Sequence, residues 1–125
     1  MKSIIRILLV EDVDEMRTFL ENFLNGMDGI QVFSLARNIW EARLELSKHR
    51  PDLVLLDEVL PGESSLDFLK EVRKEGIPVL LLTGMAEPEH PLPEGALARL
   101  RKPTEQSLSK DRQRFQAAIA AAFAS

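Results

Sequence analysis

A run of four apolar residues that ends in a carboxylate constrains this chain more than any other feature. Leu53 to Leu56 reads Leu-Val-Leu-Leu without alternation, and Asp57 follows directly. Such an unbroken run is typical of a strand that is buried on both faces of a parallel sheet. Ligands of open parallel sheets bind beyond the carboxyl ends of the strands, so we expect Asp57 to lie in a crevice. Pro61-Gly62 then turns the chain away from the sheet.

Size and charge limit the kind of protein this can be. The 125 residues suffice for one domain, residues 1–125, with a single core. A net charge of −4 predicts no nucleic-acid partner, because a protein that binds nucleic acid is expected to carry a basic stripe on its surface. The lack of cysteine excludes thiolate metal ligands and suits a cytoplasmic location. The apolar run Ile4–Val10 is too short for a membrane helix, so we expect no membrane partner.

Apolar runs alternate with amphipathic stretches along the whole chain. The runs predict strands at residues 4–10, 30–36, 53–56, 78–83 and 97–102. The stretches with helical spacing of apolar residues predict helices at about 16–25, 38–49, 64–75 and 107–123. This alternation predicts an α/β fold, a doubly wound five-stranded parallel sheet of order 2-1-3-4-5 with helices on both faces.

The stretch from Thr83 to Gly95 breaks this rhythm. A helix is expected between the fourth and fifth strands, but Pro88, Pro91 and Pro93 fall there. A proline inside a helix removes a donor and costs about 3 kcal/mol. We therefore expect the fourth helix to be short or irregular.

Polar residues follow four of the predicted strands: Glu11 and Asp12 the first, Asp57 the third, Thr83 the fourth and Lys102 the fifth. In the predicted strand order they meet at the crevice where the order switches. Three clustered carboxylates raise one another's pKa unless a cation is bound. Their oxygen-only donor set favours Mg2+. The ammonium of Lys102 and the hydroxyl group of Thr83 would suit a tetrahedral anion that approaches one of these carboxylates.

These residues resemble those of the receiver domains of two-component response regulators. The matching positions, which span essentially the whole chain, are Glu11-Asp12, Asp57, Leu60-Pro61-Gly62, Thr83-Gly84 and Lys102-Pro103. The resemblance implies a flavodoxin-like, CheY-like fold. It also implies that Asp57 accepts a phosphoryl group from a sensor histidine kinase or phosphotransfer protein and thereby switches a protein-binding surface.

The same resemblance implies the ligands of a magnesium ion. Asp12, Asp57 and the backbone carbonyl of Val59 would hold Mg2+, and Glu11 would act largely through a metal-bound water. The metal would screen the charge of the carboxylate that attacks phosphorus. The acidic crevice would thus become able to accept an anion.

The remaining matched residues would bind the phosphoryl group. Thr83 and Lys102 would bind it once it has formed, and Gly84 would leave its approach open. Val59 and Met85 stand where the family tunes the lifetime of the phosphoryl group. Both are apolar and cannot orient an attacking water, so we expect slow hydrolysis. The chain would be no enzyme beyond transfer to its own aspartate and this hydrolysis.

The chain departs from the family on the face that usually binds partners. Arg99 stands where the family usually has an aromatic residue, and the chain has no tyrosine. The proline-bearing stretch falls on the same face. The downstream partner stays open, with a weak homodimer as one option. A phosphate-independent interaction scaffold is the alternative function.

Two segments look most like receivers of chemotaxis methylesterases. They are Glu41-Ala42-Arg43 and the run from Asp57 to Pro61. We expect the likeness to concern the receiver alone, since the chain ends at Ser125, directly after the last predicted helix.

Two readings from other classes are weaker. A Mg2+-dependent phosphatase with an aspartyl nucleophile would need a second carboxylate at Val59. A flavin mononucleotide carrier would need a phosphate-binding loop rich in Ser, Thr and Gly after the first strand. Residues 11–15 read Glu-Asp-Val-Asp-Glu and would repel phosphate.

Overall fold

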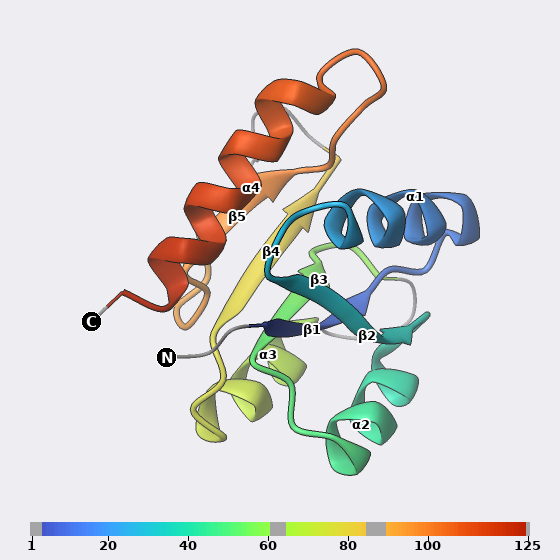
Figure 1. The fold of residues 1–125 in the computed structure, drawn as a ribbon. Helices are drawn as coiled ribbons and strands as arrows, with labels where there is room; N and C mark the ends of the chain where they lie inside the picture. The colour runs from blue at the N-terminus through green and yellow to red at the C-terminus, as the bar shows by residue number, and fades with distance from the viewer. Residues whose placement is uncertain (1–3, 61–64, 85–89, 125) are drawn as a thin grey trace.

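The computed structural model describes residues 4–60, 65–84 and 90–124 of the chain. Its strands are β1 (Ile5–Val10), β2 (Ile30–Ala36), β3 (Leu53–Asp57), β4 (Val79–Thr83) and β5 (Ala98–Arg101). Its helices are α1 (Asp14–Asn25), α2 (Ile39–Lys48), α3 (Ser65–Lys74) and α4 (Leu108–Ala122). The strands form one parallel sheet of order β2-β1-β3-β4-β5, which confirms the predicted fold (Figure 1). Within the described ranges, no helix is long and apolar enough to cross a membrane.

The sheet separates two hydrophobic cores. Along β1, Ile7 and Leu9 point to the side covered by α1 and α4, and Leu8 and Val10 point to the side covered by α2 and α3 (Figure 1). Every residue of β3 and β4 is buried. Burial on both faces explains why their sequences are unbroken apolar runs.

Local signals set the helix ends. The side chain of Asn38 accepts a hydrogen bond from the Glu41 N–H at 2.8 Å, which caps the start of α2. Gly76 follows α3 with φ of 76°, a left-handed conformation that glycine adopts without strain. The helical spacing of apolar residues over 107–123 predicts that Leu108 and Phe123 face inward, but both side chains are exposed. Phe123 lies past the last helical residue, so it no longer follows the helical period.

The described part of the connection from β4 to β5 is irregular, as the prolines predicted. Residues 90–97 contain a bend and a turn but no helix. Met85 and Pro88 lie outside the described residues, as do the predicted turn at Pro61-Gly62 and the expected helix start at Ser64. The described part of this connection thus runs past the sheet as a loop.

Candidate functional site

The candidate site lies at the carboxyl ends of the strands, where backbone hydrogen bonds continue beyond the sheet. The Glu58 N–H donates to the Leu82 carbonyl at 2.9 Å. The Lys102 N–H donates to the Thr83 carbonyl at 2.7 Å. The Glu11 N–H donates to the last residue of β2 at 3.0 Å. The residues that follow the strands are therefore held by the sheet itself.

Three carboxylates and one ammonium converge at this edge. Glu11, Asp12 and Asp57 each offer a carboxylate oxygen within 4.8 Å of the others. Lys102 Nζ lies 2.7 Å from Glu11 Oε1 and 3.2 Å from Asp57 Oδ2. Glu11 is 0% and Asp57 3% exposed. The predicted strand order thus brings together the acidic residues and the lysine that the sequence singled out.

Backbone amides hold the second oxygen of each buried carboxylate. The Val13 N–H donates to Glu11 Oε2 at 3.1 Å, and the Val59 N–H donates to Asp57 Oδ1 at 3.1 Å. Each carboxylate therefore has one oxygen near the ammonium of Lys102 and the other on an amide two residues later. The two valine side chains are exposed.

The site carries more negative than positive charge. Burial, together with the charge of Glu11, raises the pKa of Asp57 to about 6, although the Val59 N–H and Lys102 both favour its ionised form. Burial alone would lower the pKa of Lys102, but its contacts with Glu11 and Asp57 raise it. At neutral pH the pair Asp57–Lys102 is therefore ionised.

The donor set fits a hard divalent cation. Among the described residues, the buried Glu11 Oε1 has the Lys102 ammonium 2.7 Å away as an ion pair and no hydrogen bond of regular geometry. Carboxylate oxygens are ligands that Mg2+ prefers. The acidic cluster of Glu11, Asp12 and Asp57 is typical of a receiver magnesium site.

The remaining predicted residues lie on the same edge of the sheet. Thr83 ends β4 and is buried, and its carbonyl binds the backbone of Lys102. Gly84 is exposed, and a Cβ built on it would meet no atom of the other described residues within 4 Å. Ser65, which the sequence analysis missed, donates its hydroxyl to the Asp57 carbonyl at 3.2 Å.

A second ion pair beside the site was also missed. Arg99 Nε lies 2.6 Å from Glu58 Oε1, and Arg99 Nη2 lies 2.8 Å from Glu58 Oε2. The same Nη2 donates to the Pro91 carbonyl at 3.2 Å. The sequence shows the opposite charges, but only the side-chain positions show that Arg99 reaches across β4 to the end of β3.

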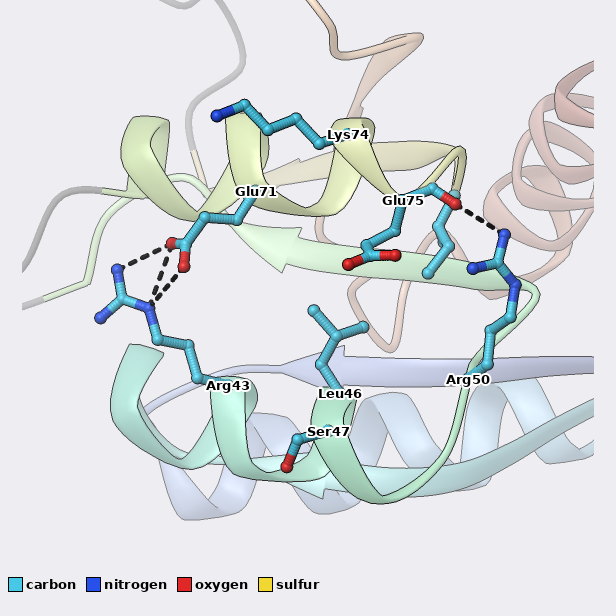
Figure 2. A pocket seen from close by; sticks show the side chains of 8 residues that line it. Arg43, Leu46, Ser47, Arg50, Glu71, Lys74 and Glu75 are labelled. Carbon is cyan, nitrogen blue, oxygen red and sulfur yellow. Dashed lines mark hydrogen bonds and ion pairs between the residues drawn. The ribbon is translucent and has the colours of Figure 1, made fainter.

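A groove of about 580 Å³ lies elsewhere, between α2 and α3 (Figure 2). Its lining is Arg43, Leu46, Ser47, Arg50, Glu71, Lys74, Glu75 and Ile77. Arg43 forms a bidentate pair with Glu71, and Arg50 donates to the Glu75 carbonyl at 2.7 Å (Figure 2). None of the clustered carboxylates lines it, so we place the chemistry at the strand ends.

Comparison with known proteins identifies the family and the fold of the chain. Residues 7–112 match the family model described as response regulator receiver domain. The KDP operon transcriptional regulatory protein KdpE of Escherichia coli is 35% identical over 82 residues, 65% of this chain and 36% of that protein. The transcriptional regulatory protein MalR of Bacillus subtilis is 32% identical over 120 residues, 92% of this chain and 48% of that protein.

Methylesterases are among the relatives too, as the sequence predicted. A protein-glutamate methylesterase/protein-glutamine glutaminase of Burkholderia thailandensis is 35% identical over 81 residues, 64% of this chain and 23% of that protein. The chain spans less than half the length of each of these three relatives.

Solved structures share the fold. The response regulator domain of Thermotoga maritima CheB matches with a TM-score of 0.80 at 20% identity, over 98% of both chains. A chain from the complex of the CheA3 P1 domain with CheY6 of R. sphaeroides matches with a TM-score of 0.80 at 22% identity, over 94% of this chain and 98% of that one. At these identities the likeness concerns the fold.

Proposed function

As a member of the response regulator receiver family, the chain is a receiver domain of a two-component system, and we propose that Asp57 accepts a phosphoryl group from a histidine kinase or a phosphotransfer protein. One observation carries this proposal. Lys102 lies between two buried carboxylates at the crevice of the sheet, and Asp12 offers a third carboxylate beside them. We propose that residues 1–125 form this one receiver domain.

Asp57 is the proposed nucleophile. A carboxylate oxygen of Asp57 forms the new O–P bond while the P–N bond to the donor histidine breaks and the imidazole leaves. With a pKa of about 6, Asp57 is ionised near neutral pH and able to attack. The Val59 N–H fixes the direction of its carboxylate. Transfer of this kind depends mainly on positioning and on stabilising the charge of the phosphoryl oxygens.

The surrounding residues balance that charge. Mg2+, when bound by Asp12, Asp57 and the Val59 carbonyl with Glu11 acting through a water, supplies positive charge that screens the carboxylates. The ammonium of Lys102 supplies the other positive charge. These residues need little rearrangement to balance the charge, because backbone hydrogen bonds to the sheet already hold them in place.

After transfer, the new dianion attracts donors. Lys102 and the Thr83 hydroxyl would bind its oxygens through charge-assisted hydrogen bonds, while Gly84 leaves room for them. The movement of these donors would be the switch that alters a protein-binding surface. The exposed, apolar Val59 cannot position a water, so we expect slow hydrolysis of the phosphoryl group.

Exposed apolar residues at the site suit a docked phosphodonor. Val13 is 51% and Val59 73% exposed, and each follows a buried carboxylate by two residues. A partner that covers both would bury apolar surface and exclude water from the phosphorus. The matched chain from the complex of the CheA3 P1 domain with CheY6 has the same fold, so a protein domain that docks on this chain is a reasonable proposal.

Intact mass after incubation with Mg2+ and acetyl phosphate tests the proposal. We expect one added phosphoryl group that requires Mg2+ and is absent from Asp57→Asn. Glu71→Gln is the matched control, because it removes a carboxylate that pairs with Arg43 away from the site and keeps the nucleophile. A folded protein that gains no mass would instead favour the phosphate-independent scaffold.

A further inference from the structure

Two adjacent acidic residues at the end of β3 pair with two basic residues at β5. Asp57 pairs with Lys102, and Glu58 pairs with Arg99. The first pair belongs to the proposed phosphorylation chemistry. The second pair has no part in that chemistry. Its geometry is nevertheless bidentate, because the Arg99 guanidinium donates to both carboxylate oxygens of Glu58.

The second pair holds the backbone from which the site is built. The Glu58 N–H is bonded to Leu82 of β4, and its side chain is bonded to Arg99 of β5, so residue 58 is attached to two neighbouring strands. Val59, the next residue, directs the Asp57 carboxylate through its N–H and would offer its carbonyl to Mg2+. Any shift of residue 58 therefore moves both groups.

We propose that Arg99 is a positioning residue: through Glu58 it fixes the backbone of residues 57–59 in the conformation that orients the Asp57 carboxylate and presents the Val59 carbonyl. This rests on the proposed function, since it concerns the metal and phosphoryl site assigned above. Arg99 also binds the Pro91 carbonyl, so the loop after β4 is fastened to the same guanidinium.

Burial sets this pair apart from another pair of the same form. The Arg99 and Glu58 side chains are 11% and 22% exposed, whereas those of Arg43 and Glu71 between α2 and α3 are 43% and 46% exposed. Water screens an ion pair less as its burial increases. The Arg99–Glu58 pair therefore restrains its backbone more firmly, and Arg43 provides a control with the same chemistry far from the site in sequence and fold.

The main experiment is a calorimetric titration of Mg2+ into the full chain and its variants. We expect Arg99→Ala to bind Mg2+ about threefold to tenfold more weakly, at the lower limit of outer-shell effects because Glu58 is itself no ligand. Arg99→Lys should recover part of the affinity, since it restores the charge without the bidentate geometry. Arg43→Ala should bind Mg2+ as the wild type does.

A metal-free measurement separates positioning from simple destabilisation. In Arg99→Ala without Mg2+, the backbone amide signals of Asp57, Glu58 and Val59 should shift more than those of β1 and α1. Glu58→Gln should shift the same three signals in a milder way, which tests the pair without deleting Arg99. Unchanged amide signals together with wild-type Mg2+ affinity in Arg99→Ala would overturn the inference.

The two proposals fail in different ways. If the wild type takes up a phosphoryl group and Arg99→Ala does so at the same rate and Mg2+ affinity, only the positioning role is wrong. If the wild type binds Mg2+ but gains no phosphoryl group, the proposed function is wrong and the positioning role stands on the Mg2+ titration. A wild type that binds no Mg2+ overturns both.

Discussion

The strand-end site and the groove between α2 and α3 are both lined by charged residues, yet they differ in balance and in burial. At the site, Glu11, Asp12 and Asp57 share the single ammonium of Lys102, and two of the carboxylates are almost fully buried. In the groove, Arg43 of α2 pairs with Glu71 of α3 (Figure 2). The Arg43 side chain is 43% exposed.

This difference indicates which kind of charge cluster can respond to a ligand. An ion pair that is exposed to water contributes little free energy, so a change in its surroundings alters stability little. Unbalanced charges under burial cost free energy until a cation or proton arrives, so they respond to ligands. The volume of a groove gives no such information, so the 580 Å³ groove is not our candidate site.

The largest effect should come from Asp57→Asn. It removes the nucleophile, so uptake of phosphoryl groups should be lost, and it removes one buried charge, so the metal-free protein should become more stable. A folded-state pKa raised from 3.8 to about 6 means that ionisation of Asp57 lowers the stability of the fold, beginning above about pH 4 and fully above about pH 6. We expect a gain of about 2 kcal/mol near neutral pH, after allowance for solvent screening, shrinking as the pH falls toward 4.

Denaturant unfolding with a chelator present, at several pH values, measures this gain. Asp12→Asn is a useful companion because Asp12 is less buried than Asp57 and should give a smaller gain. A loss of stability in Asp57→Asn at neutral pH would contradict the view that the site is strained by its charge.

Lys102→Ala should act in the opposite direction. It leaves Glu11 and Asp57 buried without their cation, so we expect a loss of roughly 2 kcal/mol in stability without metal. Added Mg2+ should reduce this loss, because it replaces the missing positive charge. Phosphorylation by acetyl phosphate should slow about 100-fold. Unfolding curves with and without Mg2+ test the first part, and equal losses in both would count against a metal site here.

Affinity for Mg2+ should depend on pH through Asp57. Below its pKa of about 6 the carboxyl holds a proton that the metal must displace, so affinity should fall by up to about tenfold per pH unit. Above pH 7 it should be nearly constant. Titrations at several pH values measure the slope. The same series in Asp57→Asn should lack this step, and a step that persists there would assign it to another group.

The smallest effect should come from Arg43→Ala in the groove. Its pair with Glu71 is largely exposed, so we expect a loss of less than about 1 kcal/mol, smaller still at high salt. Mg2+ affinity and phosphorylation should stay unchanged. A loss comparable with that of Lys102→Ala would remove the contrast between the two regions.

Most of the fold could be predicted because the apolar pattern is unambiguous. The run Leu53–Leu56 has to be buried on both faces, and it lies in the fully buried β3. The prolines before Gly95 correctly predicted that the described residues 90–97 form no helix. The ends of α4 were less predictable, because a helical period says nothing about where the helix passes beyond the sheet, as at Leu108.

The site was predictable only where topology alone decides proximity. Asp57, Glu11 and Lys102 all lie at the carboxyl ends of strands, so their meeting at the crevice could be predicted from the strand order. The pair of Glu58 with Arg99 could not, because Arg99 lies within β5 rather than at its end, and the strand order does not say where its side chain points. The resemblance marked Arg99 as unusual without indicating a partner.

The surplus of buried carboxylates should affect which substitutions a stability screen selects. Without metal, replacements that neutralise Glu11 or Asp57 should be enriched among stabilised variants, since each relieves repulsion at the price of ion binding. A screen that selects only for resistance to heat would then point to the crevice. The proposed metal-binding and phosphoryl-accepting residues would then be identified by the loss of folding stability that they cause, before any partner or phosphodonor is known.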